Sequence, residues 1–135
     1  MLDKIEHIAL AVADLEASLR LYRDVWGLEL EHREVVEDQG VEEAMLRIGD
    51  SYIQLLHPLG PETTVGRFIA RRGEGLHHIA YEVEDVALAL AELQNRGMRA
   101  IDTEPRTGSR GTRVAFLHPQ TNGGVLVELV EQPGA

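Results

Sequence analysis

The stretch HIALAVAD, residues 7–14, recurs 71 residues later as HIAYEVED, residues 78–85. Histidine, isoleucine, alanine, valine and aspartate occupy the same places in both copies. Each copy ends in an aspartate, a preferred helix N-cap, and apolar residues at helical spacing follow it. We therefore interpret the chain as a duplication in which each half begins with a strand and continues into a helix.

Three strand-like segments follow each helix, so each half has the order β-α-β-β-β. They are expected at residues 28–36, 42–48 and 52–57 in the first half and at 98–103, 113–118 and 125–130 in the second, with a linker helix at 64–72. A half with one sheet and one helix leaves a sheet face uncovered, so the halves should pack together. We expect one α+β domain with modules at 3–58 and 75–131, joined by residues 59–74.

Composition narrows the possible functions. The 135 residues include no cysteine, which excludes disulfides, thiolate metal sites and a cysteine nucleophile. A net charge of −10 disfavours nucleic acids and anionic membranes as partners. No apolar run is long enough to span a bilayer and no export signal is evident, so we expect a cytoplasmic protein. Any metal must be held by imidazole, carboxylate or amide oxygen.

Four polar side chains are expected on strands that are otherwise apolar. Because strand side chains alternate, His7 and His78 lie opposite the large apolar residues that pack under each helix. Gln54 interrupts the last strand of the first half, and Glu128 interrupts the last strand of the second. A buried carboxylate is costly unless its charge is compensated, and a bound cation is one such compensator.

His7, Gln54, His78 and Glu128 thus give each half two potential metal ligands at repeat-related places. Two imidazoles, one carboxylate and one amide oxygen suit a divalent cation such as Co²⁺, Mn²⁺, Ni²⁺, Zn²⁺ or Fe²⁺. Octahedral coordination would leave two positions for water or substrate. For each residue taken alone, the alternative is a structural role as a core histidine or an edge-exposed carboxylate.

Residues 3–131 resemble the vicinal oxygen chelate superfamily, and within it they are similar to the methylmalonyl-CoA epimerase family. The segments that carry this resemblance are DKIEHIA at 3–9, EDQGVEEAM at 37–45, GLHHIA at 75–80, FLHP at 116–119 and GVLVEL at 124–129. HIA alone indicates only the superfamily, whereas the glutamine-glycine-valine segment together with GLHH is far more specific. The resemblance implies two tandem βαβββ modules that form a cup-shaped mixed sheet around a metal.

The resemblance also implies an activity. The expected enzyme interconverts (2R)- and (2S)-methylmalonyl-CoA by removing the C2 proton through a metal-chelated enolate. His7, Gln54, His78 and Glu128 would bind the metal, with Co²⁺ preferred and Mn²⁺, Ni²⁺ or Zn²⁺ as alternatives, and Glu43 would be the catalytic base. The expected partners are an acyl-CoA substrate and a second copy of the chain in a homodimer.

The alternation of strand side chains supports Glu43 as the base. Ala44, Leu46 and Ile48 form the core face of their strand, so Glu43 points to the other side. Inversion needs a proton delivered to the opposite face of the substrate, either by a second acid or by one base that serves both faces. Glu128 is the candidate second acid, if it loosens from the metal.

Three other functions stay open at this point. A glyoxalase-I-like isomerase also moves a proton beside a metal, and an extradiol-dioxygenase-like enzyme would use two histidines and one carboxylate on iron. A metal-free, resistance-type module would bind a small molecule without chemistry. Metal analysis separates the module from the enzymes, and proton exchange on methylmalonyl-CoA separates the epimerase from the others.

The remaining basic residues have less specific roles. We do not expect the other histidines to bind the metal: His32 is interpreted as an exposed strand residue and His77 as structural. His57 precedes a proline at a strand end, and His118 lies in a similar place, where it could line the rim of the pocket. Coenzyme A phosphates need positive partners, and two arginine groups are candidates: Arg67, Arg71 and Arg72, and Arg106, Arg110 and Arg113. For each arginine taken alone, a solvated position that balances the acidic surface is the favoured interpretation.

Overall fold

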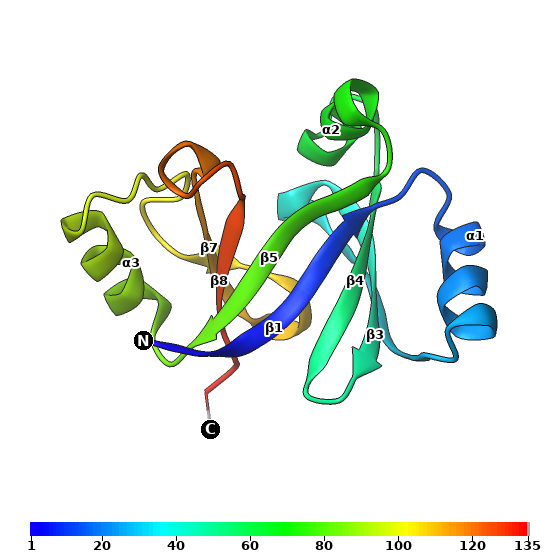
Figure 1. The fold of residues 1–135 in the computed structure, drawn as a ribbon, viewed down its shortest axis with the longest axis horizontal. Helices are drawn as coiled ribbons and strands as arrows, with labels where there is room; N and C mark the ends of the chain where they lie inside the picture. Colours follow the sequence, from blue (N-terminus) through cyan, green and yellow to red (C-terminus); the bar gives the residue numbers. More distant parts are fainter. Residues whose placement is uncertain (135) are drawn as a thin grey trace. The chain divides into compact units, whose positions relative to one another are not determined.

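Both copies of the repeat form a strand that leads into a capped helix in the computed structural model, which describes residues 1–134 (Figure 1). β1 (Leu2–Ala11) precedes α1 (Leu15–Arg20), and β5 (Gly75–Val83) precedes α3 (Val86–Asn95). The Asp14 carboxylate accepts a hydrogen bond from the backbone N–H of Ala17 at 3.0 Å. Asp85 accepts one from Leu88 at 3.1 Å. The predicted N-caps are confirmed.

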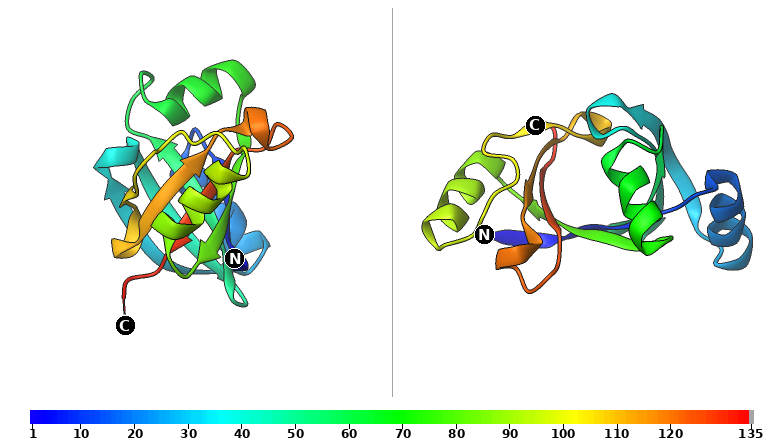
Figure 2. Two further views of the ribbon diagram at one scale, coloured as in Figure 1. Left: turned by 90° about the vertical axis from the view of Figure 1, so that its left-hand side faces the viewer. Right: turned by 90° about the horizontal axis from the view of Figure 1, so that it is seen from above.

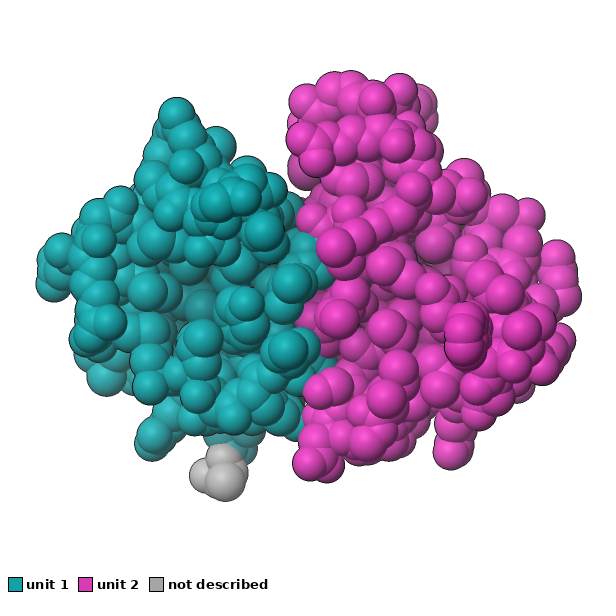
Figure 3. All heavy atoms as spheres, viewed as in Figure 1, with its two compact units in different colours: residues 1–6, 78–135 teal, residues 7–77 magenta. Residues whose placement is uncertain are grey.

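The chain divides into two compact units, one of residues 7–77 and one that combines residues 1–6 with the chain from His78 onward (Figure 3). Each unit contains one helix that follows its repeat and a mixed sheet. The α+β class expected from the sequence is therefore confirmed, with the order β-α-β-β-β in each half.

The unit of residues 7–77 has the strand order β2-β3-β4-β1. β1 runs parallel to β4, whereas β3 is antiparallel to both of its neighbours. The remaining bounds are β2 (Glu29–Val36), β3 (Val41–Ile48), β4 (Ser51–Pro58) and α2 (Thr64–Arg72). The linker helix thus lies where the sequence predicted it.

Two apolar clusters cover the two faces of this sheet. Leu15 and Leu19 of α1 pack against one face with Ala44, Leu46 and Leu55. The α2 helix packs against the other face through Val65, Phe68 and Ile69, which meet a second cluster formed by Ala9, Ala11, Val36, Val41 and Leu56. The two helices lie on opposite sides of the sheet (Figure 2). His7 shares the α2 side of β1 with Ala9 and Ala11, because side chains two apart share a face.

The second unit has the strand order β5-β8-β7-β6. Its remaining strands are β6 (Arg106–Thr107), β7 (Arg113–Leu117) and β8 (Val127–Glu131). The α3 helix covers one sheet face through a cluster that includes Val86, Leu90 and, from the strands, Val83, Leu117 and Leu129 (Figure 1). Ala80, Val114 and Val130 form a smaller cluster on the opposite face.

One predicted strand is wrong. Residues 98–103 form no strand, only an isolated bridge between Ala100 and Leu117. The Asp102 side chain accepts a hydrogen bond from the Phe116 N–H at 2.9 Å, in the place of a backbone carbonyl. Pro105 follows and cannot donate to a ladder. Regular pairing with β7 therefore resumes only at β6.

Short turns complete the fold. The first helix continues beyond Arg20 as a π-helical turn, η1 (Leu21–Val25), in which Trp26 N–H donates to Leu21 O at 3.2 Å. Three 3-10 turns are η2 (Glu37–Gln39), η3 (Ser109–Gly111) and η4 (Pro119–Thr121). In residues 1–134 none of the helices has the length and apolar character that crossing a membrane requires.

Candidate active site

The first pair of predicted ligands, His7 and Gln54, lies in the unit of residues 7–77. Gln54 of β4 is the register partner of Ala9 in the parallel strand β1, two residues beyond His7. Both side chains are almost fully buried. Within the described chain the Gln54 Oε1 atom has no hydrogen-bond partner. A buried carbonyl oxygen left without a partner costs about 1–3 kcal/mol, so this atom fits a role as ligand to a bound cation.

The second pair, His78 and Glu128, lies in the other unit. β5 and β8 run parallel, with Ala80 opposite Glu128. His78 Nε2 and Glu128 Oε1 are 3.0 Å apart, and both side chains are buried. The Phe116 ring packs edge-on against the imidazole at a centroid distance of 5.1 Å. Apolar packing fixes the ring, while imidazole and carboxylate are donor types that divalent transition metals accept.

The proposed base, Glu43, is the most deeply buried carboxylate of its unit, with 0% of its surface exposed. Its neighbour along β3, Met45, pairs with Gln54, and Glu43 itself pairs with Leu56 of the α2-side cluster. Ala44 and Leu46 belong to the cluster beneath α1. The predicted orientation of Glu43, away from the core face beneath α1, is confirmed, and the structure places it on the same face as Gln54.

Sequence reasoning missed the environment of His32. It was expected to be an exposed strand residue, but its Nε2 atom lies 2.6 Å from Glu34 Oε1 and 3.7 Å from Glu43 Oε1. Its side chain is one-third exposed. A β-bulge between Leu30 and His32 turns the residue to the Glu43 side. Simple alternation from the strand start predicts the opposite face, so the sequence carried no direct signal.

The other three histidines contact neighbouring groups of the chain, and a structural role was expected for His77. The His77 ring packs edge-on against Phe68 at 4.8 Å, and His118 Nδ1 accepts a hydrogen bond from the Gln120 N–H at 3.0 Å. His57 Nδ1 lies 3.4 Å from the Val12 carbonyl oxygen.

Four of the six candidate arginines have polar partners within the chain. Arg110 pairs with the buried Glu6 at 2.9 Å, and Arg113 lies 3.6 Å from Glu131. Arg106 lies 3.4 Å from Asp102 and stacks over the Phe116 ring. Arg67 donates to the Glu62 carbonyl oxygen at 2.8 Å. A coenzyme A phosphate would have to add to or displace these contacts.

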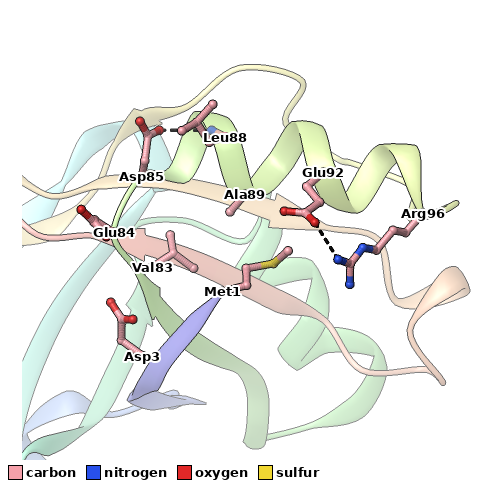
Figure 4. A pocket seen from close by; sticks show the side chains of 9 residues that line it. All are labelled: Met1, Asp3, Val83, Glu84, Asp85, Leu88, Ala89, Glu92 and Arg96. Carbon is pink, nitrogen blue, oxygen red and sulfur yellow. Dashed lines mark hydrogen bonds and ion pairs between the residues drawn. The ribbon is translucent and has the colours of Figure 1, made fainter.

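A separate hollow of about 530 Å³ lies between α3 and the start of β1 in the second unit (Figure 4). None of the predicted site residues lines it. Its carboxylates include Asp3, Glu84 and Asp85, and Glu92 pairs with Arg96 at 2.6 Å. The acidic lining repels an anionic acyl-CoA, so this hollow does not fit the expected substrate.

The fold and the buried ligand-type residues define a class of protein, and comparison with known families identifies it. The chain belongs to the Glyoxalase/Bleomycin resistance protein/Dioxygenase superfamily, whose model matches residues 6–116. Within that superfamily, its close homologues and structural neighbours are methylmalonyl-CoA epimerases.

Three of these relatives illustrate the similarity. The ethylmalonyl-CoA/methylmalonyl-CoA epimerase of Cereibacter sphaeroides is 39% identical and covers 96% of this chain and 98% of the relative. A methylmalonyl-CoA epimerase solved in complex with methylmalonyl-CoA and NH4+ is 45% identical, with a TM-score of 0.97 over 99% of this chain and 97% of that chain. A variant of the Streptomyces coelicolor enzyme, in complex with 2-nitronate-propionyl-CoA, is 44% identical, with a TM-score of 0.97 over 100% and 98%.

Proposed function

We propose that this protein is an epimerase that interconverts (2R)- and (2S)-methylmalonyl-CoA. The observation that carries the proposal is the full-length similarity to an epimerase solved with methylmalonyl-CoA. The relatives favour this activity over the glyoxalase-I-like isomerase, the extradiol dioxygenase and the metal-free binding module. An acyl-CoA is accordingly the proposed substrate.

We further propose that His7, Gln54, His78 and Glu128 bind a divalent cation, with Co²⁺ preferred and Mn²⁺, Ni²⁺ or Zn²⁺ as alternatives. The support is the buried Gln54 oxygen and the buried His78–Glu128 contact. Each residue alone costs free energy to bury, and a shared cation would offset that cost. When bound, such a cation supplies Lewis-acid stabilisation of the negative charge that develops on the substrate thioester oxygen.

Proton removal is assigned to Glu43. Its carboxylate takes the C2 proton and becomes a neutral carboxylic acid, while the electron pair of the C–H bond moves toward the thioester carbonyl. The deep burial of Glu43 keeps bulk water away from the transferred proton. Glu128 is the proposed acid that returns a proton to the opposite face, which inverts the stereocentre.

Deuterium exchange on methylmalonyl-CoA in D₂O tests the activity and the roles together. The wild-type protein should incorporate deuterium at C2 and interconvert the epimers. Glu43→Gln should keep its metal but lose roughly 10²–10⁴-fold of the exchange rate, the usual contribution of a positioned base. His78→Ala should lose the metal, as measured by elemental analysis. A wild-type protein that exchanges no C2 proton would refute the epimerase assignment.

Assembly and location are also proposals. We propose that the protein is cytoplasmic, as its bacterial epimerase relative of similar length favours. We also propose a homodimer, which the family resemblance implies. Light scattering of the purified protein at micromolar concentration measures the assembly directly, and a monomeric mass would contradict the dimer.

A further inference from the structure

The β2–β3 pair contains a bulge that reverses the face of one histidine. Leu30 pairs with Leu46, but His32 pairs with Met45, so Glu31 is an extra residue in β2. Without this shift, His32 would face α1 together with Leu30, which belongs to the α1-side cluster. Bulges near functional sites commonly re-aim a side chain in this way. Here the bulge brings His32 to the same face as Glu43.

One nitrogen of His32 lies within reach of two carboxylates. Glu34 and Glu43 are direct partners across the strands, an unfavourable arrangement for two like charges. His32 Nε2 is 2.6 Å from Glu34 Oε1 and 3.7 Å from Glu43 Oε1. The three ligand-type atoms lie within 4.8 Å of one another. The imidazole therefore mediates between two carboxylates that would otherwise repel each other.

Glu43 is buried, whereas its two polar neighbours reach the surface. Glu43 is fully buried, whereas the side chains of His32 and Glu34 are 33% and 35% exposed. Because the Glu43 side chain is fully buried, a proton on its carboxylate does not contact solvent directly. His32 and Glu34 are the partly exposed polar groups next to Glu43 on this face.

Arg47, a charged residue on the same face, makes its hydrogen bonds to groups other than the two carboxylates. Arg47 of β3 donates to Glu31 at 2.6 Å and to the Gly49 carbonyl oxygen at 2.8 Å. The hydrogen bond to Glu31, and then the nearby Tyr52, raise the pKa of the Arg47 guanidinium. Glu29 pairs with Arg47 in the ladder. The charge on Arg47 is thus directed to Glu31, while His32 faces Glu34 and Glu43.

We propose that His32 and Glu34 form a proton relay that connects the buried base Glu43 with solvent. This inference rests on the proposed function, because it takes Glu43 as the base. In this scheme His32 begins as the imidazolium, and its Nε2 passes a proton to the Glu34 carboxylate, which releases it to water and leaves a neutral imidazole. The nitrogen then takes the proton that Glu43 Oε1 has removed from the substrate, and Glu43 is again a carboxylate. One N–H or O–H bond forms for each that breaks.

The 3.7 Å separation is compatible with this transfer. A small swing of the imidazole, or one bridging water, brings His32 Nε2 within hydrogen-bond reach of Glu43, and catalytic contacts often tighten only when substrate binds. His32 does not touch the substrate in this scheme. It is a positioning residue that acts through Glu43.

The test compares deuterium uptake with epimerisation. One epimer of methylmalonyl-CoA is incubated in D₂O, and mass spectrometry measures deuterium in the recovered starting epimer relative to the amount converted. In the wild-type protein the proton on Glu43 exchanges before it returns, so the recovered epimer becomes labelled. In His32→Gln and Glu34→Gln, which keep hydrogen-bonding side chains, that label should fall about tenfold per conversion, less than the roughly 10²–10⁴-fold effect of a general base itself.

A matched control and a chemical rescue complete the experiment. His57 is a half-buried histidine on β4, where it pairs with Glu42 and not with Glu43. The His57→Gln variant should therefore incorporate as much deuterium into the recovered epimer as the wild type does. Added imidazole should restore labelling to His32→Ala. Labelling equal to wild type in all His32 and Glu34 variants would overturn the relay. Absence of any C2 exchange in the wild-type protein would instead refute the epimerase proposal.

Discussion

At the residue scale, the candidate site is built from polar side chains on strands whose alternation is otherwise apolar. Simple alternation predicted the faces of His7, Glu43 and His78 correctly, because the flanking residues pack under α1 and α3 as expected. Alternation could not predict the face on which His32 lies, because the bulge before it arises from pairing with β3 and the sequence of β2 gives no signal of it.

The partnerless Gln54 oxygen gives a prediction about stability. Gln54→Met, which keeps the volume and removes the buried polar group, should raise the free energy of unfolding of the metal-free protein by about 1 kcal/mol. The same change should weaken metal binding, because it removes one ligand. Urea unfolding in the presence of a chelator and calorimetric metal titration measure the two effects.

Gln132 is the control for Gln54. Its amide donates to Glu82 at 2.9 Å and to Glu6 at 3.2 Å, so Gln132→Met should lower the free energy of unfolding by about 1 kcal/mol. If both methionine variants destabilise the metal-free protein, Gln54 does not carry an unmet hydrogen-bonding requirement.

At the element scale, the repeat fixes where each helix begins. Asp85→Ala should lower the free energy of unfolding by about 1 kcal/mol, because the first turn of α3 loses its cap. Asp85→Asn keeps an acceptor oxygen and should stay close to the wild type. The neighbouring Glu84→Ala is the matched control, since that carboxylate makes no cap. Thermal or urea unfolding distinguishes the three variants, and equal stability of all of them would contradict the capping role.

A buried ion pair connects β1 with the turn before β7. Glu6 is 1% exposed and accepts from Arg110, which has the only positive φ (56°) among the described non-glycine residues. Arg110→Met should lower the free energy of unfolding by about 2–3 kcal/mol, slightly less than for a fully buried pair because Arg110 is 20% exposed. Adding Glu6→Gln should recover most of that loss.

Arg113 supplies the comparison for Arg110. Its side chain is 53% exposed and lies 3.6 Å from Glu131, so Arg113→Met should change the free energy of unfolding by less than about 1 kcal/mol. Similar losses for both arginines in urea unfolding would show that the Glu6 contact has no special weight.

Most helices and strands could be predicted from the sequence, but one strand could not. The linker helix and the strands β2 to β4 followed from turn signals and apolar runs. The strand predicted at residues 98–103 does not form, because the Phe116 N–H donates its hydrogen bond to the Asp102 side chain and not to a backbone carbonyl. A side chain that replaces a backbone partner depends on tertiary contact, and propensity alone does not encode it.

At the scale of the whole molecule, the net negative charge of the protein repels the proposed anionic substrate. The chain carries a net charge of −10, and a coenzyme A thioester of a dicarboxylic acid is a polyanion. The long-range field therefore repels the proposed substrate, while one of the two candidate arginine groups, Arg106, Arg110 and Arg113, already pairs with carboxylates of the chain. Seen from a distance, those three pairs are neutral and do not offset the repulsion.

Salt should consequently favour binding of the substrate. Raising ionic strength from about 0.01 M to about 0.15 M shortens the Debye length from about 30 Å to about 8 Å and screens the long-range repulsion. We expect KM for methylmalonyl-CoA to fall several-fold while kcat stays nearly constant, because proton transfer at the buried Glu43 is screened far less. Initial rates of epimerisation at constant pH in a salt series measure both quantities. A KM that rises with salt would mean that local arginine contacts to the phosphates outweigh the field of the whole protein.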